Sequence, residues 1–414
     1  MRVLVVTSLY PPHALGGYEM SCRDVVDRWR ERGHDVHVLT TDTRLPGVDD
    51  VAEPQVDRTL RWYWRDHRIV RPSWRERLDI ERHNRSVLTR ALAAQRPDVV
   101  SVWSMGAMSL GLVDVLNTSG VPAAYVICDE WPVYGPRLDG WLSGFTGRGR
   151  RLGPVARALT GLPTVLPEPR AATFCWLSDY VRAADLAATG WTPRHETLTY
   201  TGIDPADFPL QRPRAEDWRW RLLAVGRVEP RKGFAVAIDA LAELPAEATL
   251  RIVGPDDGSH RAALHQRAAD LGVADRVRFD GVVPRAQLHA VYRDADALLF
   301  PSAWAEPFGL VPVEAMANAT PVVAMPTGGA GEYLADEHNC LTATDAASLA
   351  AAVRRLATDP PLRARLVAGG LATAADLSVD RLADVLEDWH RAAADRYAGG
   401  EPAPRPAPTS VPAR

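Results

Sequence analysis

A loop in the second half of the chain carries two cations suited to bind a diphosphate. Residues 226–233 read Gly-Arg-Val-Glu-Pro-Arg-Lys-Gly, and Arg227 and Lys232 could together neutralise a diphosphate. Lys232 is the single lysine among 48 basic residues. A compact ammonium acts as a point charge where a planar guanidinium does not fit, so this lysine favours a chemical role. The alternative is a solvated basic loop.

A second loop, residues 301–314, carries two glutamates, Glu306 and Glu314, with seven residues between them. Two prolines and a glycine interrupt it, which predicts Glu306 on a rigid loop and Glu314 in the first turns of a helix. Carboxylates accept hydrogen bonds from sugar hydroxyls, and the N–H groups near Gly309 and Leu310 could point at phosphate. The alternative for Glu314 is a favourable interaction with the helix dipole alone.

A glycine pair lies near the start of the chain. Gly16 and Gly17 follow a strand-like run and precede a helical pattern. Glycine lets the backbone approach a ligand closely, and the helix start offers free N–H groups to an anion. An ordinary strand-to-helix turn is the other interpretation. The segment lacks the G-x-G-x-x-G fingerprint, which disfavours a nicotinamide enzyme.

Short apolar runs alternate with helical patterns through both halves, the order typical of parallel sheets covered by helices. The pattern predicts two doubly wound, Rossmann-like α/β domains. The first series of expected strands is residues 3–7, 35–40, 99–103, 123–127 and 172–177, and the second is 222–225, 249–253, 277–279, 297–300, 321–324 and 340–342.

The same pattern predicts the domain boundaries. Residues 1–200 form an N-terminal domain, 201–220 a proline-rich linker, and 221–375 a C-terminal domain. Residues 376–398 form a helix expected to pack back on the N-terminal domain, and the Pro/Ala-rich residues 399–414 a disordered tail.

Composition excludes several classes of partner. A net charge of −4 over 414 residues gives no global basic field for nucleic acid. The four cysteines have neither disulfide-framework nor zinc-site spacing. Asp294-Ala295-Asp296 precedes an expected strand, so we interpret it as the end of a helix rather than a metal site. The sequence shows no signal peptide or membrane-spanning run, and we expect a cytoplasmic protein.

The chain resembles the retaining glycosyltransferases of family 4, the glycogen-synthase-like "group 1" enzymes, over nearly its whole length. These enzymes have the GT-B fold, with two Rossmann-like domains facing across a cleft. The matching segments occur in the family's order: Tyr10-Pro11-Pro12 to Gly17, Arg32 to Val36, Gly202 to Asp204, Gly226-Arg227 with Lys232-Gly233, and Glu306 to Glu314.

The resemblance implies transfer of a hexose-type sugar, most commonly from a UDP-sugar, to a hydroxyl acceptor with retained configuration. Arg227, Lys232 and Glu306 would be catalytic, the two cations stabilising the leaving diphosphate. No metal or cofactor is expected. The residues implied in donor binding are Gly16, Gly17, Gly226, Val283 for the base, Phe308, Gly309, Leu310, and Glu314 for the ribose.

The sequence departs from the family after residues 123–127. Many members carry a His-Asp pair there whose histidine touches the donor sugar, whereas this chain has Cys128-Asp129-Glu130. A cysteine replaces those hydrogen bonds poorly, which makes Asp129 and Glu130 candidates for sugar or acceptor recognition. Helix capping by either carboxylate is an equally good interpretation.

Arginines alternate with aromatic residues in two N-terminal segments, residues 61–96 and 130–151. Such a surface could bind a lipid-linked or anionic acceptor, or contact a membrane interface as a peripheral protein; a solvated helix face is the alternative. The acceptor could be a cell-surface glycan intermediate or a secondary metabolite. A catalytically silent nucleotide-sugar-binding protein, a GT-B-fold epimerase and a phosphorylase are the competing functions.

Overall fold

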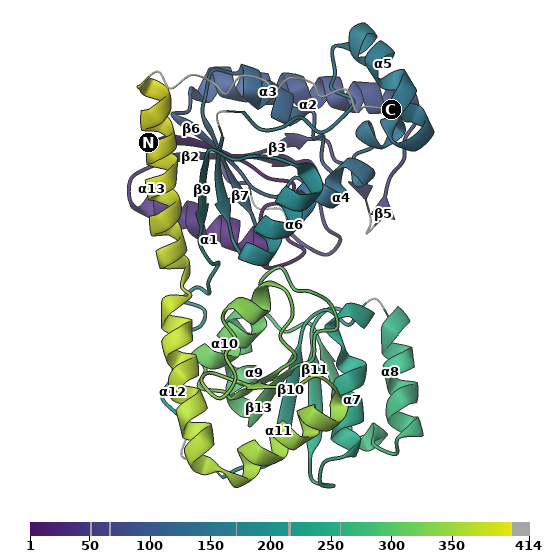
Figure 1. The fold of residues 1–414 in the computed structure, drawn as a ribbon, viewed down its shortest axis with the longest axis vertical. Helices are drawn as coiled ribbons and strands as arrows, with labels where there is room; N and C mark the ends of the chain where they lie inside the picture. Colours follow the sequence, from purple (N-terminus) through teal and green to yellow (C-terminus); the bar gives the residue numbers. More distant parts are fainter. Residues whose placement is uncertain (50–51, 66–67, 171, 214–216, 257, 400–414) are drawn as a thin grey trace. The chain divides into compact units, whose positions relative to one another are not determined.

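The computed structural model describes residues 1–49, 52–65, 68–170, 172–213, 217–256 and 258–399. They form two compact units (Figure 1). Unit 1 comprises residues 1–177, 181–199 and the described residues from 383 onward, and unit 2 comprises residues 178–180 and 200–382. Apart from Gly399, the tail predicted to be disordered lies outside the described residues.

Unit 1 is built on a seven-stranded parallel sheet in the order β3-β2-β1-β6-β7-β8-β9. Its three strands β6 to β8 are buried at every residue, as expected where helices cover both faces of a parallel sheet. The bounds are β1 Arg2–Val6, β2 Asp35–Thr41, β3 Val56–Leu60, β6 Val99–Val102, β7 Ala123–Ile127, β8 Ala172–Trp176 and β9 His195–Leu198. A small antiparallel pair joins β4 Trp64–Arg65 to β5 Arg68–Ile69.

The helices of unit 1 include the end of the described chain. Helix α13 Val379–Ala398 packs on α1 Gly17–Glu31, where the Trp29 indole N–H donates to the Ala383 carbonyl at 3.1 Å. The Trp29 ring also meets the His390 ring edge-on at 4.9 Å. The other helices are α2 Trp74–Gln95, α3 Leu112–Thr118, α4 Trp131–Leu138, α5 Gly153–Thr160 and α6 Asp179–Thr189, with 3₁₀ turns η1 Leu142–Phe145 and η2 Gly147–Leu152.

Unit 2 has a six-stranded parallel sheet in the order β12-β11-β10-β13-β14-β15. The strands are β10 Arg221–Val225, β11 Thr249–Val253, β12 Val277–Gly281, β13 Ala297–Phe300, β14 Val322–Ala324 and β15 Leu341–Thr342. The helices are α7 Phe234–Ala242, α8 Ser259–Asp270, α9 Arg285–Asp294, α10 Val311–Ala317, α11 Ala346–Thr358 and α12 Pro360–Asp376, with 3₁₀ turns η3 Pro230–Lys232, η4 Ala274–Arg276 and η5 Gly329–Glu332.

Alternation along β10 divides the core of unit 2 into two apolar clusters. Leu222 and Ala224 belong to one cluster together with residues of α7 and α11. Leu223 belongs to the other, with residues of α9 and α10. Successive strand residues point to opposite faces, so apolar side chains cover both faces of this sheet.

In both sheets the strand order reverses beside the first strand of the unit. The reversal lies between β1 and β6 in unit 1 and between β10 and β13 in unit 2. This confirms the predicted pair of doubly wound parallel sheets. Open α/β sheets bind ligands outside the carboxyl ends of their strands at such a reversal. The loops that follow β10 and β13 are therefore the candidates for a ligand-binding site in unit 2.

Candidate functional site

The two charged loops singled out in the sequence meet in unit 2. Residues 226–233 follow β10 and residues 301–310 follow β13, and these strands are parallel neighbours at the strand-order reversal. Contact between the loops is close because a Cβ on Gly233 would lie 1.8 Å from the Pro301 carbonyl oxygen. Gly233 also has φ +67°, which favours glycine.

The Lys232 ammonium binds the Glu306 carboxylate inside this loop pair. Lys232 Nζ lies 2.7 Å from Glu306 Oε1, and the Ser302 hydroxyl donates to the same oxygen at 2.7 Å. The Glu306 side chain is only 5% exposed and that of Lys232 is 23% exposed. A buried carboxylate needs such partners, so the pair holds the ammonium in a defined position. Both residues were predicted site residues, but their pairing was not predicted.

Trp304 and Ser302 belong to this site and were missed, although both lie within the second charged loop. The Arg231 guanidinium lies 4.5 Å from the centroid of the Trp304 ring, and Lys232 Nζ lies 5.9 Å from it. Arg227 is exposed at the end of β10, just after Gly226 with φ +147°. Cations on an aromatic face are held electrostatically, which concentrates positive charge at this edge of the sheet.

The remainder of the second loop is held by aromatic packing and by a hydrogen bond to its backbone. Phe308 is buried and packs between Tyr200 and Tyr333, with ring centroids at 5.6 and 4.9 Å. Gly309 has φ +85°, and its carbonyl accepts the Tyr333 hydroxyl at 2.5 Å. Leu310 is the N-cap residue of α10. The Phe308 ring is thus part of the core, whereas the backbone at 309–310 lies at a helix start as predicted.

Glu314 lies in the first turn of α10 and is buried. Its Oε2 accepts the Tyr292 hydroxyl at 2.5 Å. Burial raises the pKa of the Glu314 carboxyl, and the hydrogen bond from Tyr292 opposes that shift. Val283, just after β12, is half-buried against the same apolar cluster as Tyr292. Val283 and Glu314, to which the base and ribose contacts are assigned, therefore lie on elements that pack against the same apolar cluster.

The glycine pair of unit 1 begins α1. Gly16 is the N-cap residue, Gly17 is the first helical residue, and both are exposed. The Gly16 N–H donates to Glu19 Oε2 at 2.9 Å. Burial raises the pKa of the Glu19 carboxyl to about 7. An anion at this helix start would therefore meet one N–H that already has a partner.

Cys128, Asp129 and Glu130 follow β7 at the carboxyl edge of the sheet in unit 1 and are half-buried. Burial raises the pKa of the Cys128 thiol, which stays neutral. Asp129 accepts the Tyr134 hydroxyl at 2.7 Å and the Trp131 N–H at 3.3 Å, the contact expected of a residue just before α4. Glu130 is the N-cap residue of α4 without a side-chain cap hydrogen bond.

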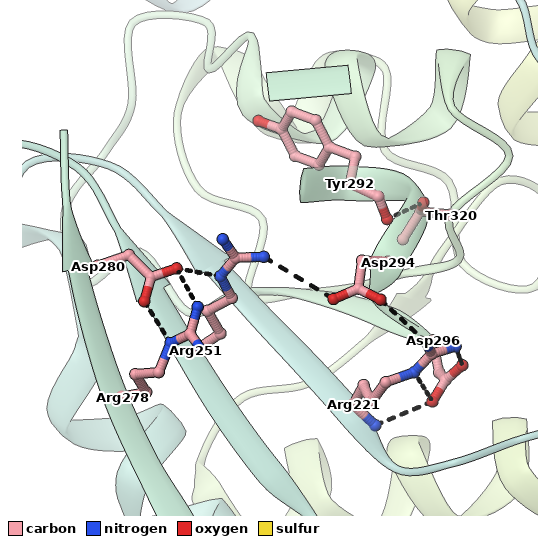
Figure 2. Close-up of polar contacts among 8 residues, drawn as sticks. All are labelled: Arg221, Arg251, Arg278, Asp280, Tyr292, Asp294, Asp296 and Thr320. Carbon is pink, nitrogen blue, oxygen red and sulfur yellow. Dashed lines mark hydrogen bonds and ion pairs between the residues drawn. The ribbon is translucent and has the colours of Figure 1, made fainter. Parts of the chain in front are cut away.

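The Asp294-Ala295-Asp296 string lies at the amino edge of the sheet in unit 2 and pairs with arginines (Figure 2). Asp296 accepts the Arg221 N–H at 2.9 Å and the Arg219 N–H at 3.0 Å, and it forms an ion pair with the Arg221 guanidinium at 3.0 Å. Asp294 pairs with Arg221 at 3.0 Å and with Arg251 at 3.9 Å. These carboxylates fix the end of α9 and the start of β13.

Some aromatic residues of the two arginine-rich segments belong to the core of unit 1. Tyr63, Trp131 and Trp141 are buried, because the segments that carry them fold against the helices of unit 1. Trp74 is 51% exposed, and Trp62, Trp64 and Tyr134 are half-buried. A different apolar group is exposed nearby, on η2 and α5: Leu152, Val155 and Leu159. Of the residues that the structure describes, none forms a helix long and apolar enough to cross a bilayer.

Comparison with known proteins agrees with this geometry. The family model "Glycosyltransferase Family 4" matches residues 15–207, and "Glycosyl transferases group 1" matches residues 211–371. A glycogen synthase of Mycobacterium tuberculosis is 29% identical over 382 residues, covering 87% of each chain.

Two solved structures share the fold. Sucrose-phosphate synthase from Thermosynechococcus elongatus has a TM-score of 0.69 at 21% identity, covering 94% of this chain and 98% of its own. HepE from Anabaena in complex with UDP-glucose has a TM-score of 0.64 at 19% identity, covering 96% and 100%. These likenesses confirm the predicted GT-B fold.

Proposed function

We propose that this chain, which belongs to the group 1 glycosyltransferases, transfers a hexose-type sugar from a UDP-sugar to a hydroxyl group of an acceptor. The observation that carries the proposal is the Lys232–Glu306 pair at the strand-order reversal of unit 2. That is where a doubly wound sheet binds a nucleotide. The HepE structure, which contains UDP-glucose, supports UDP as the nucleotide.

In the proposed reaction, Lys232 and Arg227 bind the diphosphate and stabilise the charge that develops on it. The bond between the anomeric carbon and the phosphate oxygen breaks while the acceptor oxygen bonds to the same face of that carbon. Attack on the same face retains the configuration, and the acceptor proton passes to the leaving phosphate. Charge stabilisation of this kind lowers the barrier because it is stronger in the transition state than in the bound substrate.

We propose that the two cations replace a metal ion at the diphosphate. Glu306 fixes the Lys232 ammonium, and we assign Glu306 together with the backbone at Gly309 and Leu310, at the start of α10, to the transferred sugar and phosphate. Glu314 would bind the ribose, and the backbone near Val283 the base. The family resemblance implies that Gly16 and Gly17, at the start of α1, also bind the donor.

A thermal-shift panel tests the donor. Wild-type protein and Lys232→Ala are each heated with UDP, GDP, ADP and dTDP and with their sugars, since a ligand that binds the native state raises Tm. We expect UDP and a UDP-sugar to raise the Tm of the wild type and to do so less in the variant. A wild-type Tm that no nucleotide changes would contradict the proposal.

A silent binding protein is the second candidate, because Cys128 stands where the family carries a histidine and its thiol is buried and neutral. Measuring free UDP released from the bound UDP-sugar, with and without acceptor, separates the two functions. Release that depends on acceptor supports transfer, and binding without release supports the silent protein.

We also propose peripheral contact with an anionic lipid surface through η2 and α5. Leu152, Val155 and Leu159 are exposed there, and residues 147–170 contain five arginines and one glutamate. Exposed apolar side chains beside cations suit the interface of an anionic bilayer. We expect the protein to sediment with phosphatidylglycerol vesicles, Leu159→Asp to reduce this, and Leu271→Asp in unit 2 to leave it unchanged. Equal loss in both variants would refute the contact.

A further inference from the structure

Asp185 is a buried carboxylate without a partner in the described part of unit 1. It lies in the second turn of α6 with 0% of its surface exposed. Neither Oδ1 nor Oδ2 has a hydrogen-bond partner among the described residues. Burying a carboxylate costs free energy unless it is paired, so packing alone does not account for this residue.

Asp185 belongs to the same edge of the sheet as Asp129. Strands β7 and β8 pair in parallel up to Ile127 and Trp176. Asp129 comes two residues after β7, and α6 begins just after β8. The segment that carries Asp129 and the helix that carries Asp185, its seventh residue, therefore follow neighbouring strands of the sheet.

The charges that act on Asp185 have its own sign. Burial, then Asp129, then Glu130 raise the pKa of Asp185 to about 8. The pKa of Asp129 is raised to about 6, chiefly by burial and also by the Glu130 charge, while hydrogen bonds from Tyr134 and Trp131 oppose the shift. Neighbouring like charges disfavour the ionised forms, and a cation bound at these carboxylates would reverse the effect.

Asp129 is the member of the pair that a ligand can reach. It is half-buried, whereas Asp185 is completely buried. We propose that Asp129 and Asp185 form an anionic subsite for an acceptor that carries a primary ammonium group beside its hydroxyls, such as an amino sugar or an aminocyclitol. Asp129 contacts the ammonium, and Asp185 is a positioning residue that adds negative charge from behind it. The inference rests on the proposed transferase function.

An ammonium fits these carboxylates better than a hydroxyl does. A neutral acceptor would find Asp129 already accepting two hydrogen bonds and would leave Asp185 uncompensated. An ammonium offers three donors and the missing positive charge. Among the described residues no cluster of three or more metal-ligating side chains occurs, so a divalent cation is a poorer match.

Binding of matched probes tests the subsite. Full-length protein is titrated with glucosamine, glucose and N-acetylglucosamine, and with 2-deoxystreptamine and myo-inositol. We expect each amine to bind at least about tenfold more tightly than its neutral counterparts, as one charged hydrogen bond provides. Asp185→Asn and Asp129→Asn should lose that preference, while Asp57→Asn on the exposed edge strand β3 keeps it.

The outcomes separate this inference from the proposed function. Equal binding of amines and neutral probes to the wild type would overturn the subsite, and so would a preference that survives Asp185→Asn. Competition by Mg²⁺ or Ca²⁺ in place of the amines would assign the site to a metal instead. A Tm shift with UDP that persists in Asp185→Asn shows the donor site is intact, whatever the acceptor result.

Thermal stability distinguishes this positioning role from a structural one. Because folding raises the pKa of Asp185, the folded state binds its proton more tightly, and stability falls as pH rises from the unfolded pKa towards 8. Asp185→Asn removes that penalty. Without ligand we expect the variant to melt above the wild type, with a difference that grows from pH 5 to pH 8. A lower Tm at every pH would mean that Asp185 is structural.

Discussion

Ion pairs between basic and acidic side chains lie at both ends of strands β10 and β13 in unit 2, but the number of partners that each charged group has differs between the two ends. At the amino ends, Asp296 meets two backbone N–H groups and the Arg221 guanidinium, and Asp294 meets two arginines (Figure 2). At the carboxyl ends, within the described residues, the Lys232 ammonium meets a single carboxylate. An ammonium has three donors, so the carboxyl end keeps capacity for an anion, whereas each aspartate at the amino end already has several partners.

The largest expected effect is at the carboxyl end. Lys232→Ala should lower kcat about a hundredfold, because one charge contact to the leaving diphosphate is lost. Lys232→Arg should recover only part of the rate, since a planar guanidinium does not reproduce the ammonium. Steady-state kinetics with the donor found by the panel measure both.

Loss of Lys232 also leaves Glu306 buried without its cation. The double variant Lys232→Ala/Glu306→Gln therefore serves as the stability control. If it restores Tm but not the rate, the Lys232–Glu306 pair acts in the reaction and not only in stability. Recovery of the rate together with Tm would reduce the pair to a structural contact.

A smaller effect is expected at Glu314 on the same edge. Glu314→Gln keeps the shape but removes the carboxylate that would bind the ribose, so the Kd for UDP should rise about tenfold. Calorimetry measures that affinity. Tyr292→Phe removes only the hydroxyl that donates to Glu314 and is the matched control. Unchanged affinity in Glu314→Gln would remove the ribose assignment.

At the amino end we expect loss of stability without loss of function. Arg221→Ala removes the cation of the buried Asp296 carboxylate, which keeps its two backbone donors. The free energy of unfolding should fall by about 2 kcal/mol. Urea titration measures this change, and kcat/KM of the folded variant should stay within a factor of two. A tenfold fall in kcat/KM would show that the two ends of the sheet are coupled.

The smallest effect is expected at the exposed end of the network of ion pairs drawn in Figure 2. Arg278 has a side chain that is 70% exposed, and Asp280, its partner, also contacts Arg251. Arg278→Ala should change the free energy of unfolding by less than about 0.5 kcal/mol. A larger change in the same titration would mean that the whole network acts as one unit.

The central strands were predictable because burial on both faces demands apolar runs. Residues 123–127 were predicted as a strand, and β7 has the same bounds. Within the seven-stranded sheet of unit 1, the missed strands are β3 and β9, which form its two edges. An edge strand has one neighbour and partial exposure, so its sequence can be as polar as Val-Asp-Arg-Thr-Leu in β3.

The residue types of the donor site were predictable, but their pairing was not. Lys232 and Glu306 lie 74 positions apart, and only the strand order brings their loops together. Phe308 was assigned to the ligand because sequence does not separate a core ring from a binding one. Asp185 lies within a helical pattern and gives no sequence signal, since its burial depends on tertiary packing. The donor roles remain predictions.

The contact of Gly233 with Pro301 limits how donor preference can evolve or be redesigned. A Cβ at Gly233 would overlap the Pro301 carbonyl oxygen, so neither loop can be exchanged for that of a relative without the other. The two loops should therefore be inherited and grafted as one module. Variation in donor is easier to obtain at half-buried Val283, which lies outside this contact. A library that changes Val283 and its neighbours while keeping both loops would change the base without losing the diphosphate site.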